Sequence, residues 1–240
     1  ELARRGGHVG GFDAYTASDV LRGSGLSSSA AFEVMIVTIL NHTYNGGRMS
    51  ALELAEISQY AENRYFGKPS GLLDPLSCAM GGTIYVDFAA ARTPESRALR
   101  LEMQKTGYRL CVTDTRGSHS ELTAEFAAIR QEMESVSRYF GHQTLREVQE
   151  QEVMRSLPEV RAACGDRAVL RALHFFGECR RVFQEYDCLK RGDFEGFLQL
   201  QRESGRSSIQ YGQNAYCADR PGEQPLLIAL ALSASVLKER

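Results

Sequence analysis

The sequence has no apolar run approaching the roughly 20 residues that a membrane-spanning helix needs. It also has no excess of positive charge, since 28 Lys and Arg residues stand against 30 Asp and Glu residues, for a formal net charge of −2. A basic excess is the usual electrostatic footprint of proteins that bind nucleic acid or anionic membranes. We therefore expect neither nucleic acid nor a membrane as a partner.

The N-terminus has neither a secretory signal nor an initiator methionine. Arg4 and Arg5 are followed by Gly6 and Gly7, without the apolar segment that a signal peptide places behind its charges. The missing methionine leads us to expect that these residues are part of a longer chain.

The cysteines show no pairing pattern. No two of them form a Cys-x-x-Cys pair, and no histidine cluster accompanies them, so their spacing favours buried thiols over a disulfide frame or a zinc site. Unpaired thiols are typical of a reducing compartment, and we expect a cytoplasmic location. The six are Cys78, Cys111, Cys164, Cys179, Cys188 and Cys217.

The 240 residues are 43% hydrophobic and 24% charged, which is typical of a globular chain of one large or two modest domains. The first part is richer in predicted strands and the second in predicted helices. This division predicts an α+β fold with a boundary near residues 105–116. We place the two domains at residues 1–107 and 108–240.

The periodicity of apolar residues predicts most of the individual elements. Strands are expected at residues 15–21, 82–88 and 108–113. Helices are expected at residues 30–44, 51–65, 122–140, 173–189, 194–201 and 226–237. The second of these helices has the spacing of a capping box, with Ser50 as N-cap and Glu53 three residues later. Residues 66–80 are expected to begin as a loop.

A glycine- and serine-rich segment, Gly23 to Ala31 (GSGLSSSAA), stands between the first predicted strand and the first predicted helix. Glycines let successive N–H groups point into one concavity, and the start of a helix adds unpaired N–H groups and a positive dipole end. Phosphate is the natural ligand of such a nest. The segment is neither a Walker A loop nor a Rossmann GxGxxG loop. The alternative is a flexible linker, which its place between two apolar elements disfavours.

Two carboxylates follow in the segment ENRYFGKPSGLLD, where Glu62 stands near the end of a predicted helix and Asp74 lies beyond a Gly/Pro turn. Taken alone, the first is typical of a solvated helix end and the second of a helix cap. Beside a phosphate nest they match what metal-assisted phosphoryl transfer needs. One carboxylate holds Mg²⁺, and the other takes or orients the proton of the attacking hydroxyl.

Four motifs, in order along nearly the whole chain, resemble the GHMP small-molecule kinases and the galactokinase family within them. GSGLSSSAAFE is similar to the phosphate loop, and residues 70–75 (SGLLDP) match the family's Cys-Gly-Ile-Met-Asp-Gln run after a helix-borne Glu. Residues 118–126 (SHSELTAEF) are similar to its His-Glu-Leu…Ser-Glu-Tyr run. Residues 170–208 resemble its helical region with Glu-…-Arg-Val and Gly-Asp features.

The resemblance implies the GHMP kinase fold, two α+β lobes with ATP and sugar between them, present here as a partial chain. Residues 1–107 would belong to the N-terminal lobe with the phosphate loop, and residues 108–240 to the helix-rich part of the C-terminal lobe. The implied activity is transfer of the γ-phosphate of ATP, with Mg²⁺, to the 1-hydroxyl of galactose or a related hexose. The full-length protein is expected to be a monomer.

The resemblance also assigns roles to individual residues. Ser29 and Glu62 would bind Mg²⁺, and Asp74 would be the general base facing the sugar 1-hydroxyl. Gly71 would bound the sugar pocket by its backbone, and Phe126 replaces a sugar-contacting Tyr, so it offers only a ring face. The residues expected to cradle the ATP phosphates are Gly23, Ser24, Gly25, Leu26, Ser27, Ser28 and Ser29.

The chain departs from the family pattern at Ser70, Pro75 and Phe126, which replace Cys, Gln and Tyr. Lost polar groups can change which sugar is accepted, so a sugar 1-kinase of different specificity is one alternative. A regulator that binds ATP and sugar without turnover is another, although retention of Glu62 and Asp74 favours the enzyme. The family's N-terminal signature, with its catalytic Arg, and its glycine-rich C-terminal motif lie outside these residues, so we expect the 240-residue chain alone to be inactive.

Overall fold

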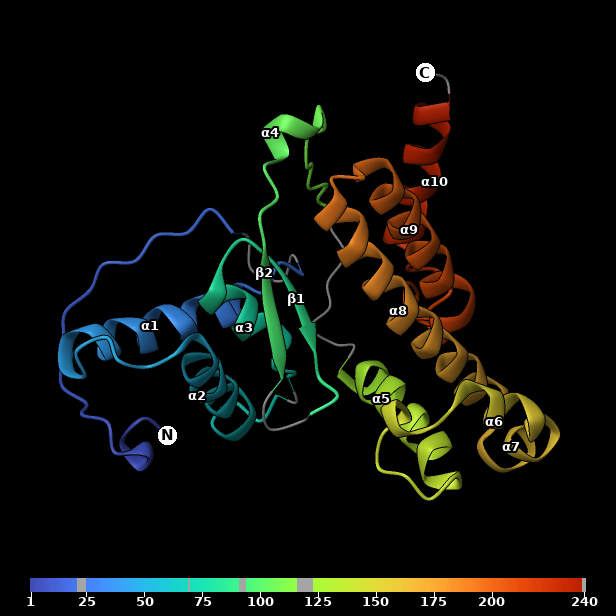
Figure 1. Cartoon of the computed structure of the whole chain (residues 1–240), viewed down its shortest axis with the longest axis horizontal. Coiled ribbons are helices and arrows are strands. Elements are labelled where there is room, and N and C mark those ends of the chain that lie inside the picture. Colours follow the sequence, from blue (N-terminus) through green and yellow to red (C-terminus); the bar gives the residue numbers. More distant parts are fainter. Residues whose placement is uncertain (21–24, 69, 91–93, 116–122, 239–240) are drawn as a thin grey trace. The chain divides into compact units, whose positions relative to one another are not determined.

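The computed structural model divides into two compact units, residues 1–101 and residues 102–240 (Figure 1). The division falls after Leu101, whereas the sequence placed it after residue 107. The residues described are 1–20, 25–68, 70–90, 94–115 and 123–238, without the side chains of residues 123, 124, 126 and 238. The two units are described separately below.

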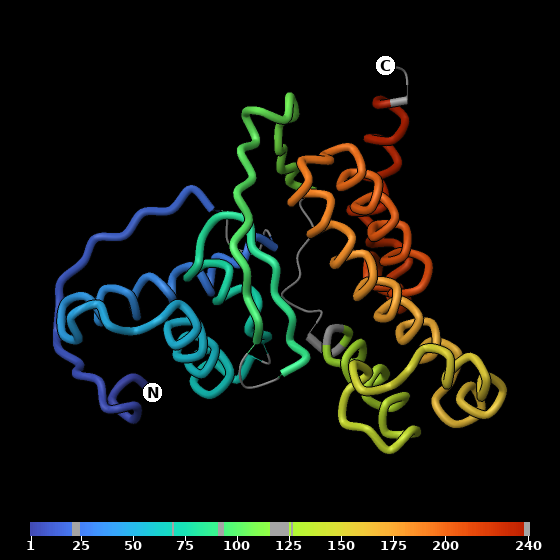
Figure 2. Tube along the Cα trace, viewed as in Figure 1, coloured from blue at the N-terminus to red at the C-terminus, as the bar shows by residue number. Residues whose placement is uncertain are grey.

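The first unit packs three helices against one another beside a two-stranded sheet, and Figure 2 traces the path of the chain through them. In the antiparallel pair, Thr83 lies opposite Leu99 and Asp87 opposite Glu95. The elements are η1 (Ala3–Arg5), α1 (Ser28–Tyr44), α2 (Ala51–Arg64), α3 (Leu73–Met80), β1 (Thr83–Asp87) and β2 (Glu95–Leu99).

The start of α2 is the capping box that the sequence predicted. The Ser50 hydroxyl accepts a hydrogen bond from the Glu53 N–H at 3.3 Å, and the Glu53 carboxylate accepts one from the Ser50 N–H at 2.8 Å. These reciprocal bonds satisfy two N–H groups that a helix start would otherwise leave unpaired. They fix where α2 begins.

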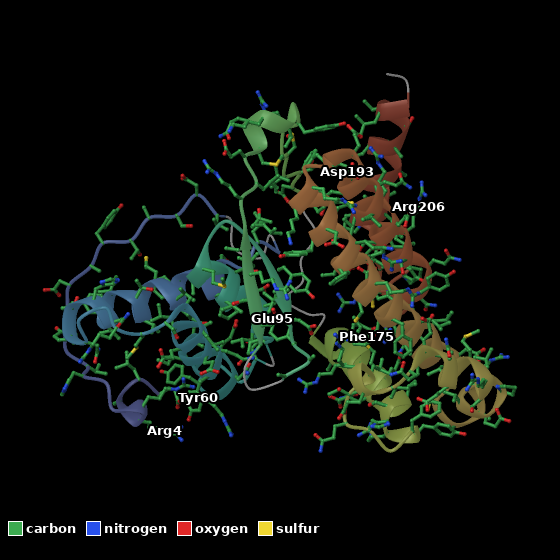
Figure 3. The ribbon with its side chains drawn as sticks, in the orientation of Figure 1. Arg4, Tyr60, Glu95, Phe175, Asp193 and Arg206 are labelled. Atoms are coloured by element: carbon green, nitrogen blue, oxygen red, sulfur yellow. The ribbon has the colours of Figure 1, made fainter. Side chains whose placement is uncertain are left out.

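The N-terminal segment is fastened to the helices of the first unit by polar contacts. Arg4 donates a hydrogen bond of 2.9 Å to the Tyr60 hydroxyl, and its guanidinium lies 5.3 Å from the centre of the Tyr60 ring (Figure 3). Asn45 at the end of α1 accepts from the His8 N–H at 2.7 Å and donates to the His8 carbonyl at 2.9 Å. Leu2 adds an apolar contact, since it is buried with Val37 and other side chains of α1 and α2.

Two of the predicted strands are wrong. Residues 15–20 form no strand, and Tyr15 is 96% exposed; residue 21 lies outside the described part. Residues 108–113 are also irregular, whereas β1 lies within its expected range, residues 82–88, and pairs with residues 95–99. A strand is stable only when it is paired and packed, and alternation along one segment does not identify the partner.

The second unit is almost entirely helical. All the helices predicted in this part of the chain are present, while the shorter α4, α6 and α7 escaped the sequence analysis. The elements are α4 (Met103–Thr106), α5 (Thr123–Tyr139), η2 (Leu145–Glu147), α6 (Glu150–Arg155), α7 (Leu157–Cys164), α8 (Asp166–Arg191), α9 (Phe194–Ser207), η3 (Ser208–Gly212, a π-helical turn) and α10 (Pro225–Lys238).

The core of the second unit lies where α5, α7 and α8 pack, with Val136, Val160 and Ala172 fully buried. A buried charge crosses this core. Arg171, 1% exposed, donates to the Glu132 carboxylate at 2.8 Å and to the Gly212 carbonyl at 3.1 Å. Because a buried guanidinium is tolerated only when it is paired and hydrogen-bonded, this residue links α5, α8 and the π-helical turn.

The cysteines differ from their expected burial. All six are free thiols, but only Cys188 is buried, while Cys78 and Cys111 are exposed. The expectation of buried thiols is therefore wrong for most of them, because spacing along the chain does not determine which side of an element faces solvent. None of the helices in the described part combines the length and the apolarity that crossing a bilayer requires.

Candidate phosphate and metal site

The chain enters α1 through two residues in the left-handed region. Gly25 has φ 76° and Ser27, the N-cap residue, has φ 55°. A non-glycine residue in this conformation is uncommon and is often found at functional sites. The Ser27 side chain does not cap the helix, so it leaves the first-turn N–H groups, at the positive end of the helix dipole, available to an anion. Gly23 and Ser24 lie outside the described residues.

The structure brings the two predicted metal ligands together. Ser29, in the first turn of α1, donates a hydrogen bond of 3.0 Å from its hydroxyl to Oε1 of Glu62, in the last turn of α2. Glu62 is only 4% exposed. A hydroxyl and a carboxylate therefore meet beside the start of α1.

A third group, Lys68, contacts the same carboxylate oxygen. Its ammonium donates to Glu62 Oε1 at 2.7 Å, and its backbone N–H donates to the Glu62 carbonyl at 3.2 Å. The loop after α2 is held against that helix by Asn63, which accepts from the Ser70 N–H at 2.8 Å. Gly67, with φ 67°, permits the turn that this path requires.

These contacts keep Glu62 ionised. Burial by itself raises the pKa of the Glu62 carboxyl, but the hydrogen bonds from Lys68, Ser70 and Ser29, together with the Lys68 charge, outweigh it. The pKa of Glu62 therefore lies below its ordinary value. At neutral pH the site presents a carboxylate, which is the form that binds a cation.

A second carboxyl lies one helical turn beyond Ser29. Burial and the neighbouring charge of Glu62 raise the pKa of Glu33 to about 7, although Lys68 opposes the shift. Its Oε2 atom is buried and has no hydrogen-bond partner among the described residues. Sequence reasoning missed Glu33, although Ser29 and Glu33 are four residues apart and so share one face of a helix. It also missed Lys68, whose proximity depends on the loop.

The donor set fits Mg²⁺. This ion prefers oxygen ligands and is commonly held by one or two carboxylates together with the phosphates of a substrate. Ser29 and Glu62 supply two such oxygens, and the Lys68 ammonium shows that a positive charge is accommodated against Glu62 Oε1.

The remaining predicted residues are not joined to this cluster. Asp74 is the second residue of α3, is exposed, and forms no hydrogen bond with Ser29 or Glu62 among the described residues. A Cβ added to Gly71 would meet no atom within 4 Å, so the space there is open. Phe126 lies in α5, and its side chain is outside the described part.

Pro75 departs from the family pattern without harming the helix. It is the third residue of α3 and is fully buried. The first N–H groups of a helix have no partner within that helix, so a proline at this position costs no hydrogen bond. The substitution therefore replaces a polar side chain with packing, and the helix that carries Asp74 still forms.

Comparison with known proteins defines the class. Residues 1–82 match the family described as GHMP kinases N terminal domain, and this range includes the start of α1, the Ser29–Glu62 contact and Asp74. The chain belongs to the GHMP kinase superfamily, and its fold is the α+β fold of that superfamily, confirming the expectation from sequence.

Within that superfamily the chain is similar to the galactokinases. It is 34% identical over 198 residues to "Galactokinase" of Homo sapiens, covering 82% of this chain and 48% of that protein. It is 31% identical over 243 residues to "Galactokinase" of Streptomyces coelicolor, covering 99% of this chain and 59% of that protein. A crystal structure of Lactococcus lactis galactokinase complexed with galactose matches with a TM-score of 0.59 and 22% identity, over 80% of this chain and 49% of that one. The chain thus spans about half the length of these relatives.

Proposed function

We propose that this protein is a sugar 1-kinase of the galactokinase type, which transfers the γ-phosphate of ATP to the 1-hydroxyl of galactose or a related hexose. The observation that carries the proposal is the hydrogen bond between Ser29 and Glu62, because it joins the start of the phosphate loop's helix to a buried carboxylate. Similarity to galactokinases supports the choice of sugar. In this proposal residues 1–101 are part of the N-terminal lobe and residues 102–240 part of the C-terminal lobe.

The start of α1 would bind the nucleotide. The N–H groups of its first turn and the hydroxyls of Ser27 and Ser28 donate to phosphate oxygens, and Gly23 and Ser24 complete the loop in sequence. The Ser29 hydroxyl and the Glu62 carboxylate hold Mg²⁺, which when bound neutralises charge on the phosphates. The low pKa of Glu62 keeps this ligand ionised without a cost in proton release.

Asp74 would accept the proton of the attacking hydroxyl. Its exposed position at the start of α3 leaves the carboxylate accessible to a sugar, and α3 packs against both helices that build the metal site. Gly71 and Phe126 would border the sugar. Phe126 has no hydroxyl, so a sugar of different specificity remains the outcome to separate from galactose.

The test is a double-mutant cycle on nucleotide binding. Ser29→Ala, Glu62→Gln and the double variant are titrated with ATP at several Mg²⁺ concentrations. We expect each single variant to weaken Mg²⁺-ATP by about tenfold or more and the double to be little worse than the stronger single, because both side chains serve one ion. Glu56→Gln, another glutamate of α2, is the matched control. Fully additive effects, or no loss of Mg²⁺ dependence, would overturn the proposed site.

A further inference from the structure

We propose that Lys68 is a phosphate-binding residue of this site. In the absence of nucleotide its ammonium pairs with Glu62, and when Mg²⁺ takes its place at Glu62 the ammonium moves to a phosphate oxygen of the nucleotide. The inference rests on the proposed function, and nothing in the resemblance assigns Lys68 a role. It gives these residues a counter-charge for the transferring phosphoryl group, which the resemblance otherwise places on an Arg outside them.

The position of Lys68 relative to the phosphate site carries the inference. Its ammonium and the Ser29 hydroxyl donate to one and the same oxygen, Glu62 Oε1, at 2.7 and 3.0 Å. Ser29 stands in the first turn of α1, where the N–H groups would face the nucleotide. One carboxylate oxygen therefore separates the lysine charge from the start of the anion-binding helix.

The loop fixes the backbone of Lys68 and leaves its side chain free to move. The Lys68 N–H donates to the Glu62 carbonyl at 3.2 Å, and the Lys68 carbonyl accepts from the Ser70 N–H at 2.9 Å. The side chain is 60% exposed, whereas that of Glu62 is 5% exposed. A four-carbon stem with a compact charge is suited to such a movement, and lysine serves as a point charge on phosphates in other nucleotide loops.

Lys68 and Mg²⁺ cannot share Glu62 Oε1. Mg²⁺ binds oxygen at about 2.0–2.1 Å, so it would lie against the ammonium that is now 2.7 Å from the same atom. Repulsion between the two positive charges displaces the lysine. The phosphates that arrive with Mg²⁺ are the nearest new negative charges, and a charge-assisted hydrogen bond to one of them replaces the lost ion pair.

The alternative is that Lys68 only balances the charge of Glu62. The two roles differ in one measurable respect. A lysine that merely balances Glu62 affects metal binding but has no effect on ATP in the absence of metal, whereas a phosphate ligand contributes to ATP affinity without metal.

The experiment compares Lys68→Met and Lys68→Arg with the control Lys105→Met, which removes an exposed lysine of the second unit. Two titrations are run on the whole chain, Mn²⁺ alone and ATP in excess EDTA. For Lys68→Met we expect ATP affinity in EDTA to fall by about tenfold or more and Mn²⁺ affinity to rise, because its competitor is gone. Lys68→Arg should retain most of the ATP affinity, since it keeps the charge.

A second variant covers loss of folding, because Lys68→Met leaves a buried carboxylate unpaired. The Lys68→Met/Glu62→Gln double variant removes both charges and should bind ATP in EDTA more weakly than Glu62→Gln alone. Unchanged ATP affinity in EDTA for either comparison would overturn the role of Lys68 while leaving the Mg²⁺ site intact. Wild-type protein that binds ATP neither with nor without Mg²⁺ would overturn the proposed function itself.

Discussion

Ser29 Oγ and Glu62 Oε1 are 3.0 Å apart although their residues are separated by 33 positions in the chain. Ser29 begins one helix and Glu62 ends the next, and the two helices pack against each other. The pairing places a hydroxyl, a buried carboxylate and the positive end of a helix dipole at one point. Such a combination favours an anion that brings its own cation, as Mg²⁺-ATP does.

Asp74→Asn should remove turnover and spare nucleotide binding. The amide cannot accept the proton of the attacking hydroxyl, so kcat in the complete natural protein is expected to fall by about 10²–10⁴. ATP affinity should stay the same, since Asp74 makes no hydrogen bond to Ser29 or Glu62 within the described residues. A coupled ADP-release assay and an ATP titration measure the two quantities. Asp13→Asn, at another exposed aspartate, is the control, and near-normal kcat would remove Asp74 from the mechanism.

Phe126→Tyr should shift sugar preference toward galactose. The added hydroxyl restores a polar group that the family pattern has at this position, and a pocket that hydrogen-bonds a substrate hydroxyl discriminates more strongly than an apolar one. The measurement is kcat/KM across a panel of hexoses. Identical specificity ratios in the variant and the wild type would place Phe126 outside the sugar pocket.

Glu33 should make the first unit less stable as pH rises. Its pKa of about 7 in the folded protein lies above its ordinary value of 4.5, so the folded state binds the proton more tightly than the unfolded state. Its contribution to stability is present below pH 4.5 and is lost as pH rises through 7. Glu33→Gln should therefore stabilise the chain at pH 8 relative to pH 5, by about 1 kcal/mol because the side chain is partly exposed and screened.

Urea unfolding at the two pH values, in EDTA, tests the role of Glu33. Glu159→Gln, at an exposed glutamate of α7, is the control and should leave the pH dependence of the unfolding free energy as it is in the wild type. A Glu33→Gln variant with the same pH dependence as the wild type would contradict the prediction.

Arg171→Ala should destabilise the second unit far more than Arg167→Ala. Both arginines pair with Glu132, but the side chain of Arg171 is 1% exposed and that of Arg167 is 41% exposed. Loss of Arg171 leaves Glu132 short of a partner and the Gly212 carbonyl unpaired in the core, at a cost of about 3 kcal/mol. Loss of Arg167 should cost less than about 1 kcal/mol. Urea denaturation of the two variants gives the comparison, and equal midpoints would refute it.

The sequence by itself determined the helices and the identity of the candidate ligands. The Ser50–Glu53 capping box depends on residues three apart, and the apolar stripe of α8 depends on spacings of three and four, so both are written in local order. The phosphate loop could likewise be recognised as a local run of glycine and serine.

Tertiary structure decided which distant groups meet. Residues 95–99 pair with β1 although their sequence, ESRAL, has no strand-like alternation, because a strand's stability comes from its partner. Glu33 and Lys68 join Ser29 and Glu62 only because α1 packs on α2 and the loop after α2 folds back onto it. Contacts of this kind depend on the packing of whole helices rather than on the order of neighbouring residues, so no local pattern in the chain records them.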